Sequence, residues 1–319
     1  MNFKILITTA IFLLITCSGL YARKPGRGFF DTKTSGLDKP VGLNSNKKSL
    51  KLHITKKKDD LGRYYLIKTP YFKIRSYASK SLSNKTAKVL EETRNDFIEI
   101  FDIKDGEKLT ASVIVYKNVS DFRKYSTGIA SNLKAHAGYY IPAKKTLILY
   151  DMDNDKEFLS ILTHELTHLF LHFLIEKVPL WLNEGMACYM AASEERYGTL
   201  RGGSIDEDKL FIFQFYSKKG KLIPLREIIQ TKIYFRGSAL QLQYAEYWAI
   251  VFFLLHGEKG KYRKKFIEFI YKLIDGKQKL NVLYSDLFGD YDDFFKEWIK
   301  YINKLNPNIG KVKKKLKLF

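Results

Sequence analysis

Residues 157–177 constrain the fold of this chain more than any other segment. Their apolar side chains recur at helical spacing without proline or glycine, which predicts a long and largely buried helix. The middle of this helix reads His-Glu-Leu-Thr-His and places His164, Glu165 and His168 among apolar neighbours. Buried polar side chains cost free energy unless they find partners. The helix therefore needs either a bound ligand or a set of hydrogen bonds at its centre.

The spacing of the two histidines favours a metal ion as that ligand. Positions four apart in a helix are about 6 Å apart along the axis and share one face. His164 and His168 would point toward a single ion, and Glu165 could reach a water bound to it, as in zinc hydrolases. The alternative is a pair of histidines that are satisfied by ordinary hydrogen bonds.

Catalytic zinc needs a third protein ligand. No further histidine of the segment is suitably placed to be that ligand. His172 lies on the same face but about 12 Å along the axis from His164, too far for zinc–nitrogen bonds of about 2.1 Å. The extended zinc-binding motif HExxHxxGxxH is also absent, because Leu171 and Leu174 stand where that motif has its glycine and its third histidine.

Glu184 is the best remaining candidate for the third ligand. It stands sixteen residues after His168 in the string Trp-Leu-Asn-Glu-Gly-Met-Ala. Pro179 would end one helix or begin the next, and residues 180–192 again have helical spacing. A helix–turn–helix could fold Glu184 back against the two histidines.

The strings HELTH and PLWLNEGMACYM resemble the gluzincin clan of zinc metallopeptidases, and most closely the bacterial peptidase MA-like families. The resemblance extends loosely over about residues 61–303. It implies that His164, His168 and Glu184 bind one Zn²⁺ and that Glu165 is the general base. It also implies that a tyrosine from a later helix stabilises the oxyanion; Tyr244 fits better than Tyr247, although simple packing is the alternative for both.

The resemblance also implies that a peptide substrate pairs with the edge strand before the zinc helix. Residues 145–150 have strand character, and residues 138–141 could be their hairpin partner; an ordinary core hairpin is the equal alternative. One position departs from thermolysin-like relatives. Cys188 stands where those enzymes have an aspartate that orients a histidine, so another group must do that work or the site is weaker.

The first 22 residues indicate export. A single lysine precedes an apolar run of about a dozen residues, which is typical of a signal peptide and short for a membrane span. Ordinary cleavage near Ala22 is one interpretation; the other is a lipoprotein anchored through Cys17. In either case Cys17 cannot pair with Cys188, which argues against a disulfide framework. We expect Cys188 to be buried.

The net charge of +21 raises the question of nucleic-acid binding. Residues 23–58 hold eleven lysines and arginines against two aspartates, and residues 311–319 add five lysines. Most of the excess positive charge therefore lies near the two ends of the chain. These segments could hold the protein near anionic lipid or wall polymer, or they could simply be a solvated tether. We expect no specific nucleic-acid partner.

The predicted fold is α+β. We expect a signal peptide (1–22), a basic linker without regular structure (23–60), a gluzincin-like domain (61–305) and a basic tail (306–319). Within the domain, a mixed α/β half with an edge strand (61–156) packs on a mainly helical half (157–305). Apart from the two helices of the motif, the sequence predicts helices at 80–101, 239–255, 261–275 and 292–303.

The expected function is exported zinc-dependent hydrolysis of peptide bonds. The alternative is a non-catalytic exported zinc-binding protein of the envelope.

Overall fold

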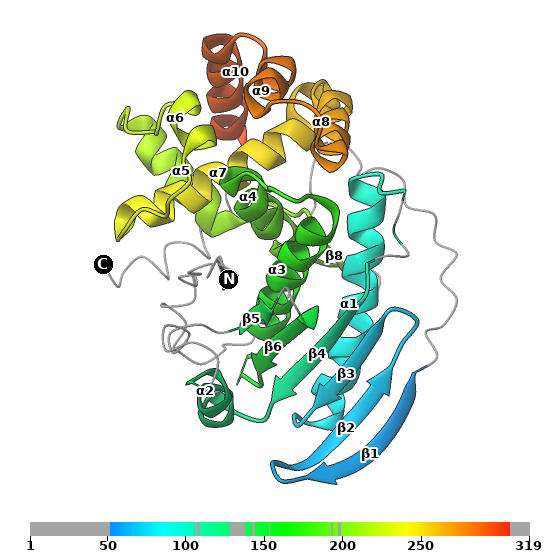
Figure 1. Cartoon of the computed structure of the whole chain (residues 1–319). Coiled ribbons are helices and arrows are strands. Elements are labelled where there is room, and N and C mark those ends of the chain that lie inside the picture. Colours follow the sequence, from blue (N-terminus) through cyan, green and yellow to red (C-terminus); the bar gives the residue numbers. More distant parts are fainter. Residues whose placement is uncertain are drawn as a thin grey trace, which may run out of the picture.

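The computed structural model describes residues 52–306 except 105, 107–108, 128–137, 142–143, 153, 193 and 197–198. The predicted signal peptide, most of the linker and the basic tail lie outside these residues. The described chain is α+β, with a six-stranded mixed sheet in the N-terminal half and helices in the C-terminal half (Figure 1).

The strands are β1 (His53–Asp59), β2 (Gly62–Lys68), β3 (Phe72–Ser76), β4 (Ala111–Tyr116), β5 (Gly138–Ile141), β6 (Thr146–Tyr150), β7 (Glu194–Arg196) and β8 (Thr199–Arg201). The helices are α1 (Lys80–Ile100), α2 (Val119–Thr127), α3 (Asp155–Leu174), α4 (Leu180–Ala191), α5 (Glu207–Lys218), α6 (Leu225–Gln230), α7 (Ser238–His256), the 3-10 turn Gly257–Gly260, α8 (Arg263–Asp275), α9 (Leu280–Phe288) and α10 (Tyr291–Lys304).

The large sheet has the strand order β1-β2-β3-β4-β6-β5. The β3–β4 and β4–β6 pairs are parallel and the others are antiparallel. Alternate residues of β3, such as Phe72 and Ile74, are buried in the core that includes α1 and α3. The opposite face is covered at one end by α2, where Phe122 packs against Tyr139 of β5 and Tyr150 of β6.

The sheet departs from the sequence prediction in two places. Residues 53–59, which the sequence assigns to the linker, form β1 and pair with β2 along their whole length. Most side chains of β1 are exposed and three in a row are lysines, so the strand lacks the apolar alternation that marks one in a sequence. In addition, β6 is an interior strand between β4 and β5, and β5 is the edge strand of the hairpin.

The helical half is built around α7, which is buried along nearly all its length. It packs against α4 and α5, and α4 in turn packs against α3. The fully buried tryptophans Trp181, Trp248 and Trp298 lie in this half. Across the described residues, no helix has both the length and the apolar character needed to cross a membrane.

Candidate metal centre

Helices α3 and α4 bring the three predicted ligands together. The Nε2 atoms of His164 and His168 lie 3.6 Å and 3.7 Å from Oε2 of Glu184. One donor atom from each residue fits within a cluster in which no two atoms are more than 4.8 Å apart. Ligands of a tetrahedral zinc with bonds of about 2.1 Å are about 3.4 Å apart, so the three donors are close to the spacing that a single ion requires.

The polar atoms of this cluster need a partner that the protein itself does not supply. His168 and Glu184 are 2% and 0% exposed, and neither Nε2 of His168 nor Oε2 of Glu184 has a hydrogen-bond partner among the described residues. Buried polar atoms without partners are costly. A cation between these donors would satisfy both atoms, so the residues fit a metal ion.

The ionisation of the cluster also suits a metal. Burial lowers the pKa of His168 to about 4, although the charge of Glu184 opposes the shift. Burial alone would raise the pKa of Glu184, but the two histidines and a hydrogen bond from Tyr234 hold it below its usual value. A neutral imidazole and a charged carboxylate are the forms that bind metal ions.

The position of Glu184 depends on a close contact between α4 and α7. Pro179 is the N-cap residue of α4, so this helix starts a new direction after α3 ends at Leu174. A Cβ atom on Gly185 would lie 2.5 Å from the backbone oxygen of Tyr247 on α7. Only glycine therefore allows α4 to approach α7 so closely, with the adjacent Glu184 turned toward α3.

Glu165 lies beside the donor cluster on α3 and is 1% exposed. Its Oε2 atom has no hydrogen-bond partner among the described residues. Burial raises the pKa of Glu165 well above its usual value, and the negative charge of Glu184 raises it further. A carboxyl group with a raised pKa accepts a proton more readily than an ordinary carboxylate, as a general base requires.

His172 and Tyr140 connect the metal helix to β5. The His172 ring packs on the Tyr140 ring with 5.5 Å between centroids. Burial raises the pKa of Tyr140, and so does the charge of Glu165, which places its hydroxyl in the field of that carboxylate. His172 is not part of the donor cluster, as its distance along the helix predicts.

Tyr234, before α7, is a site residue that the sequence does not predict. Its hydroxyl donates a hydrogen bond of 2.7 Å to Oε1 of Glu184, the carboxylate oxygen that does not face the histidines. Outer partners of this kind orient metal ligands. Tyr234 stands in a short non-helical stretch with no motif around it, so nothing in the sequence distinguishes it from the other twenty tyrosines.

Gln243 of α7 holds the segment that contains Tyr234. Its Oε1 atom accepts from the backbone N–H of Phe235, and its Nε2 atom donates to the backbone oxygen of Ile233, both at 2.9 Å. The same Nε2 atom donates to the Tyr247 hydroxyl at 2.9 Å. Gln243 is fully buried, so these bonds are shielded from water and hold residues 233–235 in one conformation.

The predicted tyrosine Tyr244 also lies next to Tyr234. The two rings are stacked, with 6.3 Å between centroids and 18° between planes. Tyr244 is 3% exposed, whereas Tyr247 is fully buried and accepts the bond from Gln243. The contacts of Tyr247 are those of a structural residue, while Tyr244 stacks on Tyr234, the tyrosine that donates to Glu184.

Cys188 is a buried cysteine on α4, as the sequence predicts. A thiol therefore stands at the position where the resemblance stated above implies an acidic group. The hydrogen bond from Tyr234 is made to Glu184, and it comes from a segment of the chain outside α4. The site thus has an outer partner for Glu184 that the motif itself does not contain.

A family described as Protein of unknown function (DUF1570) matches residues 159–277. This is less than half of the chain, but it contains the HELTH segment, Glu184, Tyr234 and Tyr244. Over these residues the chain is similar to that family. No curated protein matches it.

Proposed function

We propose that the chain is a zinc-dependent metallopeptidase of the gluzincin type. The observation that supports this most is the convergence of His164, His168 and Glu184 from two helices beside the buried carboxyl of Glu165. Two imidazoles and one carboxylate form a donor set typical of catalytic zinc with an open position for water or substrate. A purely structural site would have no use for Glu165.

In this proposal the protein residues divide the work of hydrolysis. A zinc ion in the site would act as a Lewis acid on the substrate carbonyl and the attacking water. Glu165 takes the proton of that water on a carboxylate oxygen and delivers it to the leaving amine. The Tyr244 hydroxyl donates to the oxygen that becomes negatively charged. Tyr234 and Gln243 hold Glu184 in place throughout.

Two features support a peptide as the substrate. Among the described strands, β5 is at the edge of the sheet and pairs only with β6. An extended peptide can add to such an edge through main-chain hydrogen bonds. Strand β5 also contains Tyr140, whose pKa responds to Glu165, so a peptide paired with β5 would pass close to the general base.

The proposed setting is outside the bacterial cytoplasm, in the periplasm, envelope or medium. This rests on the apolar stretch after Lys4 and applies to either interpretation of its cleavage. The basic segments at both ends would give a peripheral or lipid-anchored form a further attraction to anionic surfaces.

Metal analysis and a single substitution test the proposal. The wild-type chain should contain one zinc per molecule and cleave members of a peptide library. Glu165→Gln should retain the zinc and lose at least about a thousandfold in kcat/KM, because it removes the group that moves the proton. Glu157→Gln makes the same change nearer the start of α3 and should cleave normally.

Two results would refute this function. A purified wild-type chain without zinc would exclude the metal site. A chain that holds zinc but cleaves no peptide, with or without Glu165, would instead be the non-catalytic binding protein.

A further inference from the structure

A row of polar side chains crosses three strands of the large sheet. Lys68 of β2 is directly opposite Lys73 of β3, and Lys73 is directly opposite Ser112 of β4. Side chains at such positions share one face and lie about 5 Å apart. We call Lys68, Lys73 and Ser112 the lysine row.

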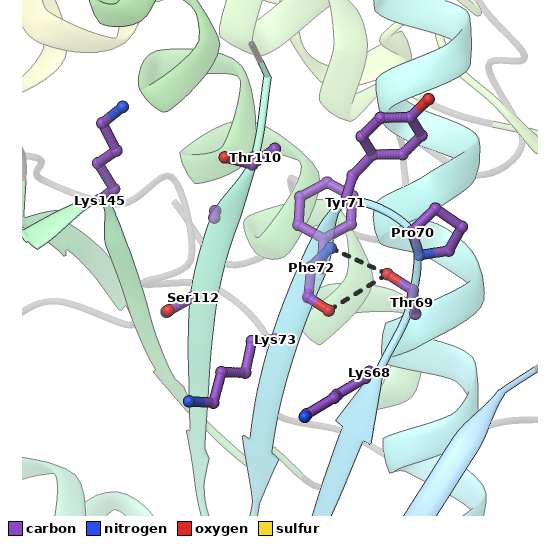
Figure 2. A pocket seen from close by; sticks show the side chains of 10 residues that line it. Lys68, Thr69, Pro70, Tyr71, Phe72, Lys73, Thr110, Ser112 and Lys145 are labelled. Carbon is purple, nitrogen blue, oxygen red and sulfur yellow. Dashed lines mark hydrogen bonds between the residues drawn. The ribbon is translucent and has the colours of Figure 1, made fainter. Parts of the chain in front are cut away.

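The lysine row borders a hollow of about 450 Å³ where β2 ends and β3 and β4 begin. Figure 2 shows the Lys68 and Lys73 side chains running the same way from neighbouring strands, with Ser112 on the strand beyond. Lys145 also lines the hollow, but its Nζ atom lies 4.5 Å from the centre of the Phe173 ring on α3. The positive charge of the row therefore comes from Lys68 and Lys73.

No carboxylate among the described residues that line the hollow balances this charge. The described residues that line the hollow include three lysines and no carboxylate. By contrast, Arg75, the next residue of β3 on the same face, lies 3.6 Å from Asp59 and over the Tyr64 ring. The protein thus compensates one cation of this face and leaves the adjacent lysine pair without a carboxylate in the hollow.

A pair of like charges directly opposite each other weakens a sheet. Lysines on an edge strand protect it against aggregation, and the lysines of β1 fit that explanation. It does not apply to β2 and β3, which are interior strands. An anion that binds between Lys68 and Lys73 would remove the repulsion between them. Without a bound anion, the opposite placement of the two lysines does not stabilise the sheet.

We propose that the lysine row binds a phosphate group. A phosphate oxyanion offers more than one negative charge and several acceptor oxygens, which match two ammonium groups and one hydroxyl donor. A carboxylate has a single negative charge and would leave the charge of one lysine unbalanced. The hollow is larger than a bare ion, so it has room for a phosphate that belongs to a larger molecule, whether a lipid headgroup or a soluble phosphoester.

Charge-matched variants of the full chain test this site. Lys68→Gln/Lys73→Gln removes the row, while Lys264→Gln/Lys265→Gln removes two exposed lysines from α8 and leaves the same net charge. Each protein is titrated with inorganic phosphate and with vesicles of phosphatidylcholine, with and without phosphatidylglycerol. The row variant should bind phosphate about tenfold more weakly than wild type, and the control should stay within about twofold.

The two titrations also separate the sources of the phosphate. Row-dependent binding to phosphatidylglycerol vesicles that is tighter than the binding of inorganic phosphate, and that phosphate displaces only at high concentration, would assign the site to a lipid headgroup. Row-dependent binding of phosphate without vesicle binding would assign it to a soluble phosphoester. Equal losses in both charge variants, or no loss in either, would overturn the proposal.

A third variant keeps the test valid if the double substitution disturbs the sheet. Ser112→Ala leaves the net charge unchanged and removes only the hydroxyl donor of the row. It should weaken phosphate binding severalfold at an unchanged melting temperature. Unchanged binding by a folded Ser112→Ala protein, together with a row variant that cannot be folded, would also count against the site.

Discussion

The hydrogen bond from Tyr234 to Glu184 gives a sharp test of how the metal centre is built. The change Tyr234→Phe removes one hydroxyl group and keeps the ring that stacks on Tyr244. It leaves Oε1 of Glu184 without the donor 2.7 Å away, in a place where this side chain is fully buried. The carboxylate should then be less well oriented toward the histidines.

The size of the effect follows from the kind of bond that is lost. A hydrogen bond to a charged group contributes about 1.5–3 kcal/mol, and loss of an outer partner of a metal ligand costs about 10–100-fold in metal affinity. These two estimates agree, since each factor of ten is about 1.4 kcal/mol. We therefore expect zinc to dissociate from Tyr234→Phe with a Kd about 10–100-fold higher than that of wild type.

The assay is a zinc competition titration against a chelating indicator, followed by activity at saturating zinc. Tyr244→Phe is the matched control, because it removes a hydroxyl from the ring stacked on Tyr234. It should keep the wild-type zinc affinity and lose kcat, whereas Tyr234→Phe should recover most of its activity once zinc is saturating. A Tyr234→Phe protein that binds zinc as tightly as wild type would refute the positioning role of this bond.

Three further predictions concern stability and the metal. Gly185→Ala should lower the melting temperature and the zinc content together, because the added Cβ meets the backbone oxygen of Tyr247 at 2.5 Å; a soluble variant with full zinc content would contradict this. The folded state lowers the pKa of His256 to about 4, chiefly through burial and further through Arg263. The stabilisation from neutral His256 is complete above about pH 6.5 and should fall by about 2–4 kcal/mol as the pH drops toward 4; in denaturant titrations the loss of stability over this range should be smaller by that amount in His256→Phe than in wild type. Finally, His172→Ala should keep one zinc per chain, and a chelator should lower its melting temperature as it does for wild type; loss of the metal would make His172 a ligand after all.

The helices that carry the site follow from local patterns in the sequence. Helix α3 has no proline or glycine, α4 is apolar along most of its length, and the i, i+4 spacing of His164 and His168 is a local property of a helix. For the same reason the bounds of α1, α7, α8 and α10 differ from the predicted ranges by no more than two residues at either end. A local pattern is enough because each of these helices buries one face or all of its surface.

Other parts of the molecule are decided only by the tertiary structure. The lysine-rich β1 is a strand because β2 pairs with it, not because of its own pattern. The parallel pairing of β4 with β6 determines which strand of the β5–β6 hairpin lies at the edge. The first depends on the pairing of a hairpin that closes between Asp59 and Gly62, and the second on contacts between distant residues such as Val113 and Leu147.

The metal centre shows the same division. Residues 164–168 and Glu184 indicate a site, because metal chemistry demands certain side chains at certain spacings in a helix. The sequence does not predict the role of Tyr234. That role depends on its hydrogen bond to Glu184, fifty positions away, and on the hydrogen bonds by which Gln243 holds residues 233–235. The sequence by itself thus determined which side chains could hold a metal. Only the packing of α4 against α3 and α7 decided that they meet, and which neighbour orients them.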